Sequence, residues 1–107
     1  MDYWGSRCPL TGITEPALLR ASHIVPWADS TDEQRLDVYN GLLLSALWDA
    51  AFDNGLVSFG DDGTVLVSPN LSGVARKALG VDHVSPLKGL RSGHQKNLAA
   101  HRARHGL

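Results

Sequence analysis

Residues 40–55, NGLLLSALWDAAFDNG, carry the signals of a strand that runs directly into a helix. The Asn-Gly pair at 40–41 is a tight-turn signal, and the three leucines of 42–44 predict a short buried strand. Ser45 is the expected helix cap, and the Asn-Gly pair at 54–55 predicts where the helix ends. The apolar positions expected between these two signals are Leu47, Trp48, Ala51 and Phe52.

A second strand is expected upstream, over Leu18 to Val25, where Pro26 stops it. The polar stretch ADSTDEQRLDVYNG (28–41) joins the two strands, and Ser30 or Thr31 is the expected cap of a short helical turn over residues 32–36. Two strands followed by a helix form a hairpin-plus-helix unit, which can gather polar side chains around one small metal ion.

The rest of the chain predicts a second hairpin and two further helices. Alternating strands over 56–59 and 64–68 flank the turn GDDG (60–63). A helix is expected over 72–79, ended by Gly80, and a last one over about 92–105. The 107 residues are expected to form one domain of the α+β class, spanning residues 1–107.

Composition limits the class of protein. No apolar run is long enough for a transmembrane span, and the start, MDYWGSRCPLTG, lacks the pattern of a signal peptide. The lone Cys8 excludes an internal disulfide and a multi-cysteine zinc site, is expected to be a small buried hydrophobe, and fits a cytoplasmic setting. Tyr3 and Trp4 suggest a domain excised from a longer chain, although they would also suit a natural start whose aromatic residues cover the core.

The net charge of −1 hides an asymmetry along the chain. Residues 1–70 hold three arginines against ten acidic residues, a net charge of −7. Residues 71–107 hold seven basic residues against Asp82 alone, a net charge of +6. An acidic first part and a basic tail suit a hard-metal site beside a surface that grips a polyanion, although a solvated basic helix gives the same pattern.

Polar residues of the hairpin-plus-helix unit are the candidates for chemistry. Asp49 and Asp53 are four residues apart, so they share one helix face, and a divalent cation or exposure to solvent would relieve their repulsion. Asp53 lies near the helix end, where it could also cap or form a salt bridge. His23 alone would suit a buried strand position as well as a site.

The order His23–Asn40–Asp49 resembles the HNH endonuclease motif of the ββα-metal superfamily, in which the second and third positions are usually nine residues apart, as they are here. The phrases LLRASHIVPW, RLDVYNGLLL, FDNGLVSF and NLAAHRARHG are similar to the branch found in many putative bacterial restriction endonucleases. The resemblance implies a ββα-metal core with an appended β-hairpin and C-terminal helices.

It also implies roles for individual residues. His23 would be the general base that takes a proton from the attacking water, and Asn40 would hold the loop or orient His23. Asp49, with help from Asp53, would bind a divalent ion, Mg²⁺ or Mn²⁺, and no structural zinc is expected. Ser22 stands where many relatives have an acidic metal ligand, and a neutral hydroxyl is a poor ligand.

The basic tail supplies the expected contacts to DNA: Lys96, Arg102 and Arg104. For His101 and Arg102, reaching the scissile phosphate and packing against the domain are both open. Trp27 and Trp48 are expected in the core rather than as platforms for bases.

The expected function is metal-dependent cleavage of DNA in a bacterial restriction or defence setting, with no membrane, and a homodimer would suit double-strand breaks. The alternative is a catalytically weak HNH-like domain that only binds nucleic acid, which Ser22 favours. A plain interaction domain is the third hypothesis, and the order of the three motif residues argues against it.

Overall fold

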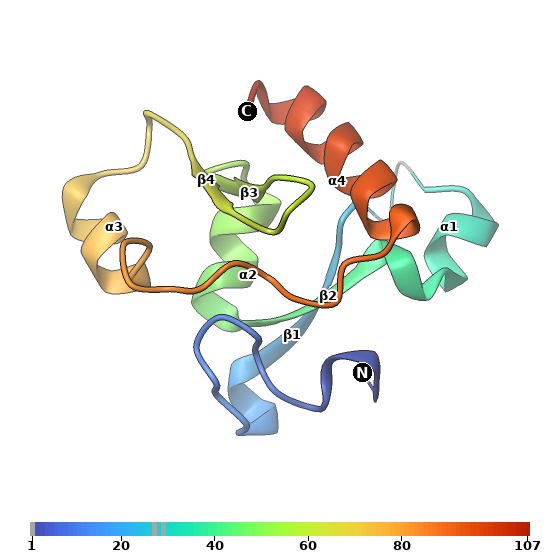
Figure 1. The fold of residues 1–107 in the computed structure, drawn as a ribbon, viewed down its shortest axis with the longest axis horizontal. Helices are drawn as coiled ribbons and strands as arrows, with labels where there is room; N and C mark the ends of the chain where they lie inside the picture. Colours follow the sequence, from blue (N-terminus) through green and yellow to red (C-terminus); the bar gives the residue numbers. More distant parts are fainter. Residues whose placement is uncertain (1, 27, 29) are drawn as a thin grey trace.

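The computed structural model describes residues 2–26, 28 and 30–107, so the expectation for Trp27 lies outside the described residues. Figure 1 shows a central strand pair and helix with further elements around them. The helices and strands are β1 (Leu19–His23), α1 (Asp32–Leu36), β2 (Gly41–Ser45), α2 (Ala46–Asp53), β3 (Val57–Phe59), β4 (Val65–Val67), α3 (Gly73–Leu79) and α4 (Ser92–His105). Mixed helices and small antiparallel sheets confirm the α+β class and are compatible with a ββα core that carries further C-terminal helices.

The first strand pair and α2 form the expected unit. β1 and β2 are antiparallel, with Ser22 opposite Leu42 and His23 opposite Gly41. Ser45 is the N-cap residue of α2, as expected, but its side chain makes no capping bond. Gly55 has a φ of 69°, a left-handed conformation that glycine adopts without strain, and the chain leaves the helix there.

The segment between β1 and β2 is more structured than a plain loop. Thr31 caps α1 through a capping box with Gln34, which decides between the two expected caps. Ser30 donates instead to the carbonyl oxygens of Val25 and Pro26. A 3₁₀ turn over Val38–Asn40 then leads into β2.

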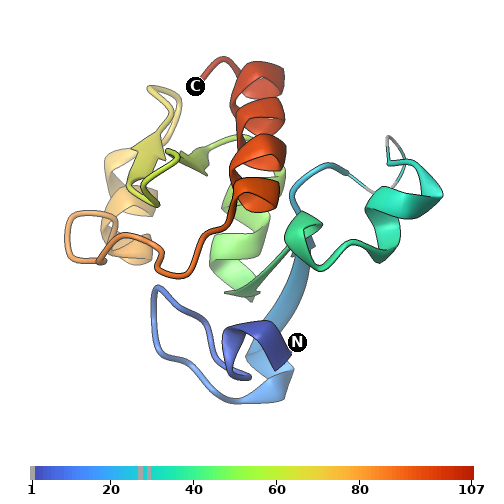
Figure 2. The same cartoon turned by 45° about the vertical axis from the view of Figure 1, so that its right-hand side comes forward.

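The second half of the chain follows the sequence prediction closely. β3 and β4 pair antiparallel around the GDDG turn, and Ser72 caps α3, which ends at Gly80 with a φ of 73°. Figure 2 shows α4 standing between the β3–β4 hairpin on one side and α1 with its following turn on the other. The last helix therefore joins the two halves of the chain.

The core is apolar and lies around β2 and α2. All five residues of β2 are buried, and Trp48 and Phe52 of α2 are almost completely buried. Leu47, which the sequence analysis named as an apolar position of this helix, is not part of the core, because it lies in the first turn of α2 with 54% of its surface exposed. Cys8 is buried, and Trp48 bonds to the carbonyl oxygen of Leu79, which ties α3 to the core. Among the described residues, no helix is long and apolar enough to cross a membrane.

Candidate active site

Ser22 and Asp49 meet where β1 packs against α2. The hydroxyl of Ser22, which is 4% exposed, donates a hydrogen bond to Oδ1 of Asp49. Asp49 is half-buried in the first turn of α2, where the partial positive charge of a helix N-terminus favours a carboxylate. Ser22 therefore positions the carboxylate. Sequence reasoning missed this role, because it treated Ser22 only as a missing metal ligand.

His23 ends β1, directly after Ser22. It is half-buried and lies opposite Gly41 in the strand pair. The next residue, Ile24, donates its backbone N–H to the carbonyl oxygen of Asn40 at 3.0 Å. Hydrogen bonds therefore fix the backbone on both sides of His23. The residues before it pair with β2, and Ile24 after it bonds to Asn40.

Asn40 is 1% exposed, and its side-chain amide forms hydrogen bonds with backbone groups. Its Oδ1 accepts from the N–H of Val25 at 2.7 Å, and its Nδ2 donates to the carbonyl oxygens of Val25 at 3.3 Å and Gln34 at 3.1 Å. These bonds fasten the chain that leaves β1 to the segment that enters β2. They match the loop-holding role expected for Asn40.

Asp53 is the last residue of α2, exposed and one turn beyond Asp49. Asn54 bonds to the carbonyl oxygen of Ala50 through its own Nδ2 at 2.7 Å. Among the described residues, Asp53 takes part in no side-chain cap and no ion pair. A carboxylate at the negative end of a helix dipole is destabilised, and a nearby cation would reverse that effect.

The three basic residues expected to bind DNA lie in different surroundings on α4. Arg102 is 19% exposed at its side chain, donates to the carbonyl oxygen of Phe59 at 2.8 Å and pairs with Asp61 at 3.0 Å. Exposed Lys96 borders a cavity of about 470 Å³ together with Glu33 and Asp37. Both residues therefore have acidic side chains near them, Asp61 for Arg102 and Glu33 and Asp37 for Lys96.

Arg104 is exposed and lies near the segment that follows β1. It borders a small cavity of about 120 Å³ with Ile24, Val25 and Pro26, the residues that follow His23. The structure therefore brings Arg104 to the segment that Asn40 holds.

His101 packs inside the protein, one of the two alternatives that the sequence left open. It is 3% exposed and stacks on Phe52, with ring centroids 3.9 Å apart. Its Nε2 lies 2.8 Å from the carbonyl oxygen of Phe52, which can only accept, so Nε2 carries the proton and Ser58 donates to Nδ1 at 2.7 Å. Burial lowers the pKa of His101 to about 4, and these contacts match the packing alternative.

The described residues contain no cluster of three or more His, Cys, Asp or Glu side chains that could hold a metal ion. What the structure does bring together is Ser22 with Asp49, and Asn40 with the chain just beyond His23. Any ion bound at Asp49 and Asp53 would have to complete its coordination with water or substrate oxygens.

Comparison with known proteins gives one family and no curated relative. Residues 8–60 match the family model described as HNH endonuclease. That range contains β1, the Asn40 turn, β2, α2 and β3. No curated protein matches the chain. The family resemblance is thereby confirmed, and residues 8–60 belong to the HNH endonuclease family.

Proposed function

We propose that this protein is a metal-dependent endonuclease that hydrolyses phosphodiester bonds of DNA. The observation that carries the proposal is the contact between Ser22 and Asp49, because it holds a carboxylate on α2 next to the strand end that bears His23. The family match over the same elements supports nuclease chemistry.

His23 is proposed as the general base. A neutral imidazole can take a proton from water near neutral pH, and phosphodiester hydrolysis requires such a step on the attacking water. Asn40 acts as a positioning residue, since its three side-chain bonds fix the backbone that follows His23. The hydroxyl of Ser22 has the same kind of role towards Asp49.

The oxygen donors on α2 suit Mg²⁺ or Mn²⁺. Mg²⁺ in proteins is commonly held by one or two carboxylates and keeps several waters, so Asp49 with Asp53 one turn away is a sufficient protein contribution. Such an ion, when bound, offsets the negative charge that develops on the phosphate. Because Ser22 is neutral, we expect a weakly held ion.

A bacterial restriction or defence setting, with DNA as the substrate, extends the same proposal. It is supported by the sequence phrases around the motif and by the basic α4, where Arg104 borders the segment after His23. Lys96 and Arg102 are proposed as further contacts to the phosphate backbone. A homodimer would allow cleavage of both strands.

The test is conversion of supercoiled plasmid by the whole chain in Mg²⁺ or Mn²⁺, with a chelator as control. The proposal predicts nicked or linear product only with the ion, and at least a hundredfold slower conversion by Asp49→Asn. Glu15→Gln is the matched control, since it also removes one carboxylate, from an exposed residue whose side chain makes no capping bond.

Conversion that is unaffected by Asp49→Asn would contradict the assigned site. DNA binding without conversion in any divalent ion would favour the alternative, a domain that only binds nucleic acid.

A further inference from the structure

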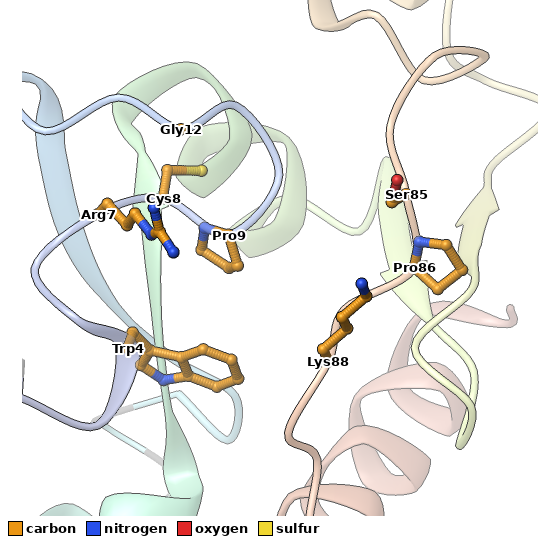
Figure 3. Close-up of a pocket in the computed structure, with 8 residues that line it drawn as sticks. All are labelled: Trp4, Arg7, Cys8, Pro9, Gly12, Ser85, Pro86 and Lys88. Atoms are coloured by element: carbon orange, nitrogen blue, oxygen red, sulfur yellow. The ribbon is translucent and has the colours of Figure 1, made fainter.

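A second polar cavity lies away from the Ser22–Asp49 contact. It has a volume of about 420 Å³ and is formed by two segments far apart in the sequence, residues 4–12 and 85–88. Figure 3 shows Arg7 with Trp4 and Pro9 on one wall, and Lys88 with Ser85 and Pro86 on the other. The lining of the cavity thus combines two cationic side chains with apolar ones.

Hydrogen bonds hold both walls of this cavity in place. On one side, the N–H of Cys8 bonds to the carbonyl oxygen of Ile13 at 3.0 Å, and the N–H of Gly12 bonds to that of Cys8 at 2.8 Å. The hydroxyl of Tyr3 donates to the carbonyl oxygen of Gly89, which joins one wall to the other.

The second wall is also fixed by the β3–β4 turn. The N–H of Leu87 bonds to the carbonyl oxygen of Gly63 at 3.0 Å. A Cβ on Gly63 would lie 2.2 Å from the carbonyl oxygen of Leu87, so the close approach requires glycine there. A cavity with walls held in this way is formed before any ligand binds, which lowers the entropic cost of binding.

The charged side chains that line the cavity are both positive. Its lining includes Arg7 and Lys88 but no acidic residue, and both cations are exposed. Neither has an ion pair within the part of the chain that the structure describes. By contrast, Arg76 and Arg102 each pair with an aspartate. The unneutralised pair favours an anion, and the hydroxyl of Ser85 adds a neutral hydrogen-bonding group to the lining.

One of the residues that line the cavity, Trp4, is bonded to β2. Trp4 donates from Nε1 to the carbonyl oxygen of Gly41 at 3.1 Å. Gly41 is the strand partner of His23. One wall of the cavity is therefore bonded directly to the strand that pairs with β1.

We propose that the Arg7–Lys88 cavity binds a backbone phosphate of the nucleic acid, at a nucleotide other than the one that is cleaved. This inference rests on the proposed function for the identity of the polyanion. The cavity adds affinity and fixes the path of the strand, and it has no part in the chemical step.

The test measures binding of a DNA duplex in the presence of a chelator, over a range of salt concentrations, so that cleavage does not interfere. We expect the double variant Arg7→Gln/Lys88→Gln to bind about tenfold more weakly at low salt. The slope of log affinity against log salt should fall by roughly 1 to 2, because each lost phosphate contact removes about one released counterion.

Arg76→Gln/Lys77→Gln is the matched control, because it removes the same charge from α3, and it should stay within about twofold of the parent. Arg7→Lys/Lys88→Arg should restore parental binding. Equal losses in the two glutamine variants would overturn the cavity proposal, since they would reveal only a general effect of net charge. Inhibition of duplex binding by millimolar inorganic phosphate to the same extent in parent and in Arg7→Gln/Lys88→Gln would also overturn it.

Failure of the proposed function is a separate result. It would appear as absence of plasmid conversion by a parent protein whose duplex binding still depends on Arg7 and Lys88. A parent that does not bind duplex at all would overturn the cavity proposal.

Discussion

The ββα unit and α4 differ in the polarity of the side chains that they bury. β2 and α2 bury leucines and aromatic residues, and the main polar contacts of the unit converge on Asp49 and on the chain next to His23. The buried face of α4 contains Leu98 together with three polar residues, His94, Asn97 and His101. Asn97 donates to the carbonyl oxygen of Tyr39 at 2.9 Å, and His101 binds that of Phe52.

The two regions therefore contribute to stability in different ways. The ββα unit supplies most of the core. Polar side chains of α4 instead form hydrogen bonds with the backbone carbonyl groups of Tyr39, next to Asn40, and of Phe52, near the end of α2. Burying a polar group costs free energy unless the group is hydrogen-bonded, as Asn97 and His101 are. The following predictions, ordered by expected size, test whether the two regions are distinct in this way.

Asn40→Ala should lower the free energy of unfolding by about 3 kcal/mol, because it removes three hydrogen bonds made by a buried side chain and leaves the N–H of Val25 without its partner. Urea unfolding measures the change. Asn54→Ala is the matched control and should cost less than about 1 kcal/mol, since its amide is exposed. Equal effects of the two substitutions would show that the contacts of Asn40 do not anchor the unit.

The stability contributed by His101 should depend on pH. Its folded pKa of about 4 lies below the ordinary value of 6.5, so the unfolded chain binds the proton first. The contribution is complete above pH 6.5 and is lost as the pH falls towards 4, by about 2 kcal/mol after allowance for solvent screening.

Thermal unfolding between pH 7.5 and 4.5 measures this loss, and His101→Gln should flatten the profile. His83→Gln is the control, because His83 is an exposed histidine and its replacement should leave the profile unchanged. A profile that is just as steep in His101→Gln would assign the acid sensitivity to another group.

Arg102→Ala should lower the free energy of unfolding by about 1 to 2 kcal/mol, since it removes the bonds to Phe59 and Asp61. Arg104→Ala should weaken DNA binding more than Arg102→Ala does, because Arg104 borders the segment after His23. Unfolding and duplex affinity, measured on both variants, separate the two effects. Loss of affinity without loss of stability in Arg102→Ala would place Arg102 mainly in the DNA contact.

Ser22→Ala should have the smallest effect. It removes one hydrogen bond to Asp49, which is worth about 1 kcal/mol, and should slow plasmid conversion several-fold by loosening the carboxylate. Ser92→Ala, at an exposed serine, is the control. Faster conversion by Ser22→Ala would mean that the bond withholds Asp49 from its ligand instead of orienting it.

Local signals explain why most elements could be predicted from the sequence. Capping at Thr31 and Ser72, and glycine at positions 55 and 80, fix helix ends through bonds within a few residues. The hairpin and α4 were predicted almost to the residue for the same reason. Periodicity did not separate exposed Leu47 from the buried apolar residues of α2, because it does not tell which side of a short helix is covered.

The contacts that define the candidate site could not be predicted in this way. Ser22 and Asp49 are 27 residues apart, and Arg102 and Phe59 are 43 apart. Such bonds depend on how whole elements pack, and no propensity at either residue encodes the partner. The motif located His23, Asn40 and Asp49, whereas the roles of Ser22 and His101 required the fold.

The most direct test of the account is the single-turnover cleavage rate of His23→Ala in Mg²⁺ or Mn²⁺, measured beside His83→Ala. The account predicts a rate at least a hundredfold below that of the parent for His23→Ala, with unchanged duplex binding, because a positioned general base contributes about 10²–10⁴ in rate. His83→Ala, at an exposed histidine in the turn after α3, should cleave like the parent. Equal rates for His23→Ala and the parent would contradict the assignment of His23 as the base.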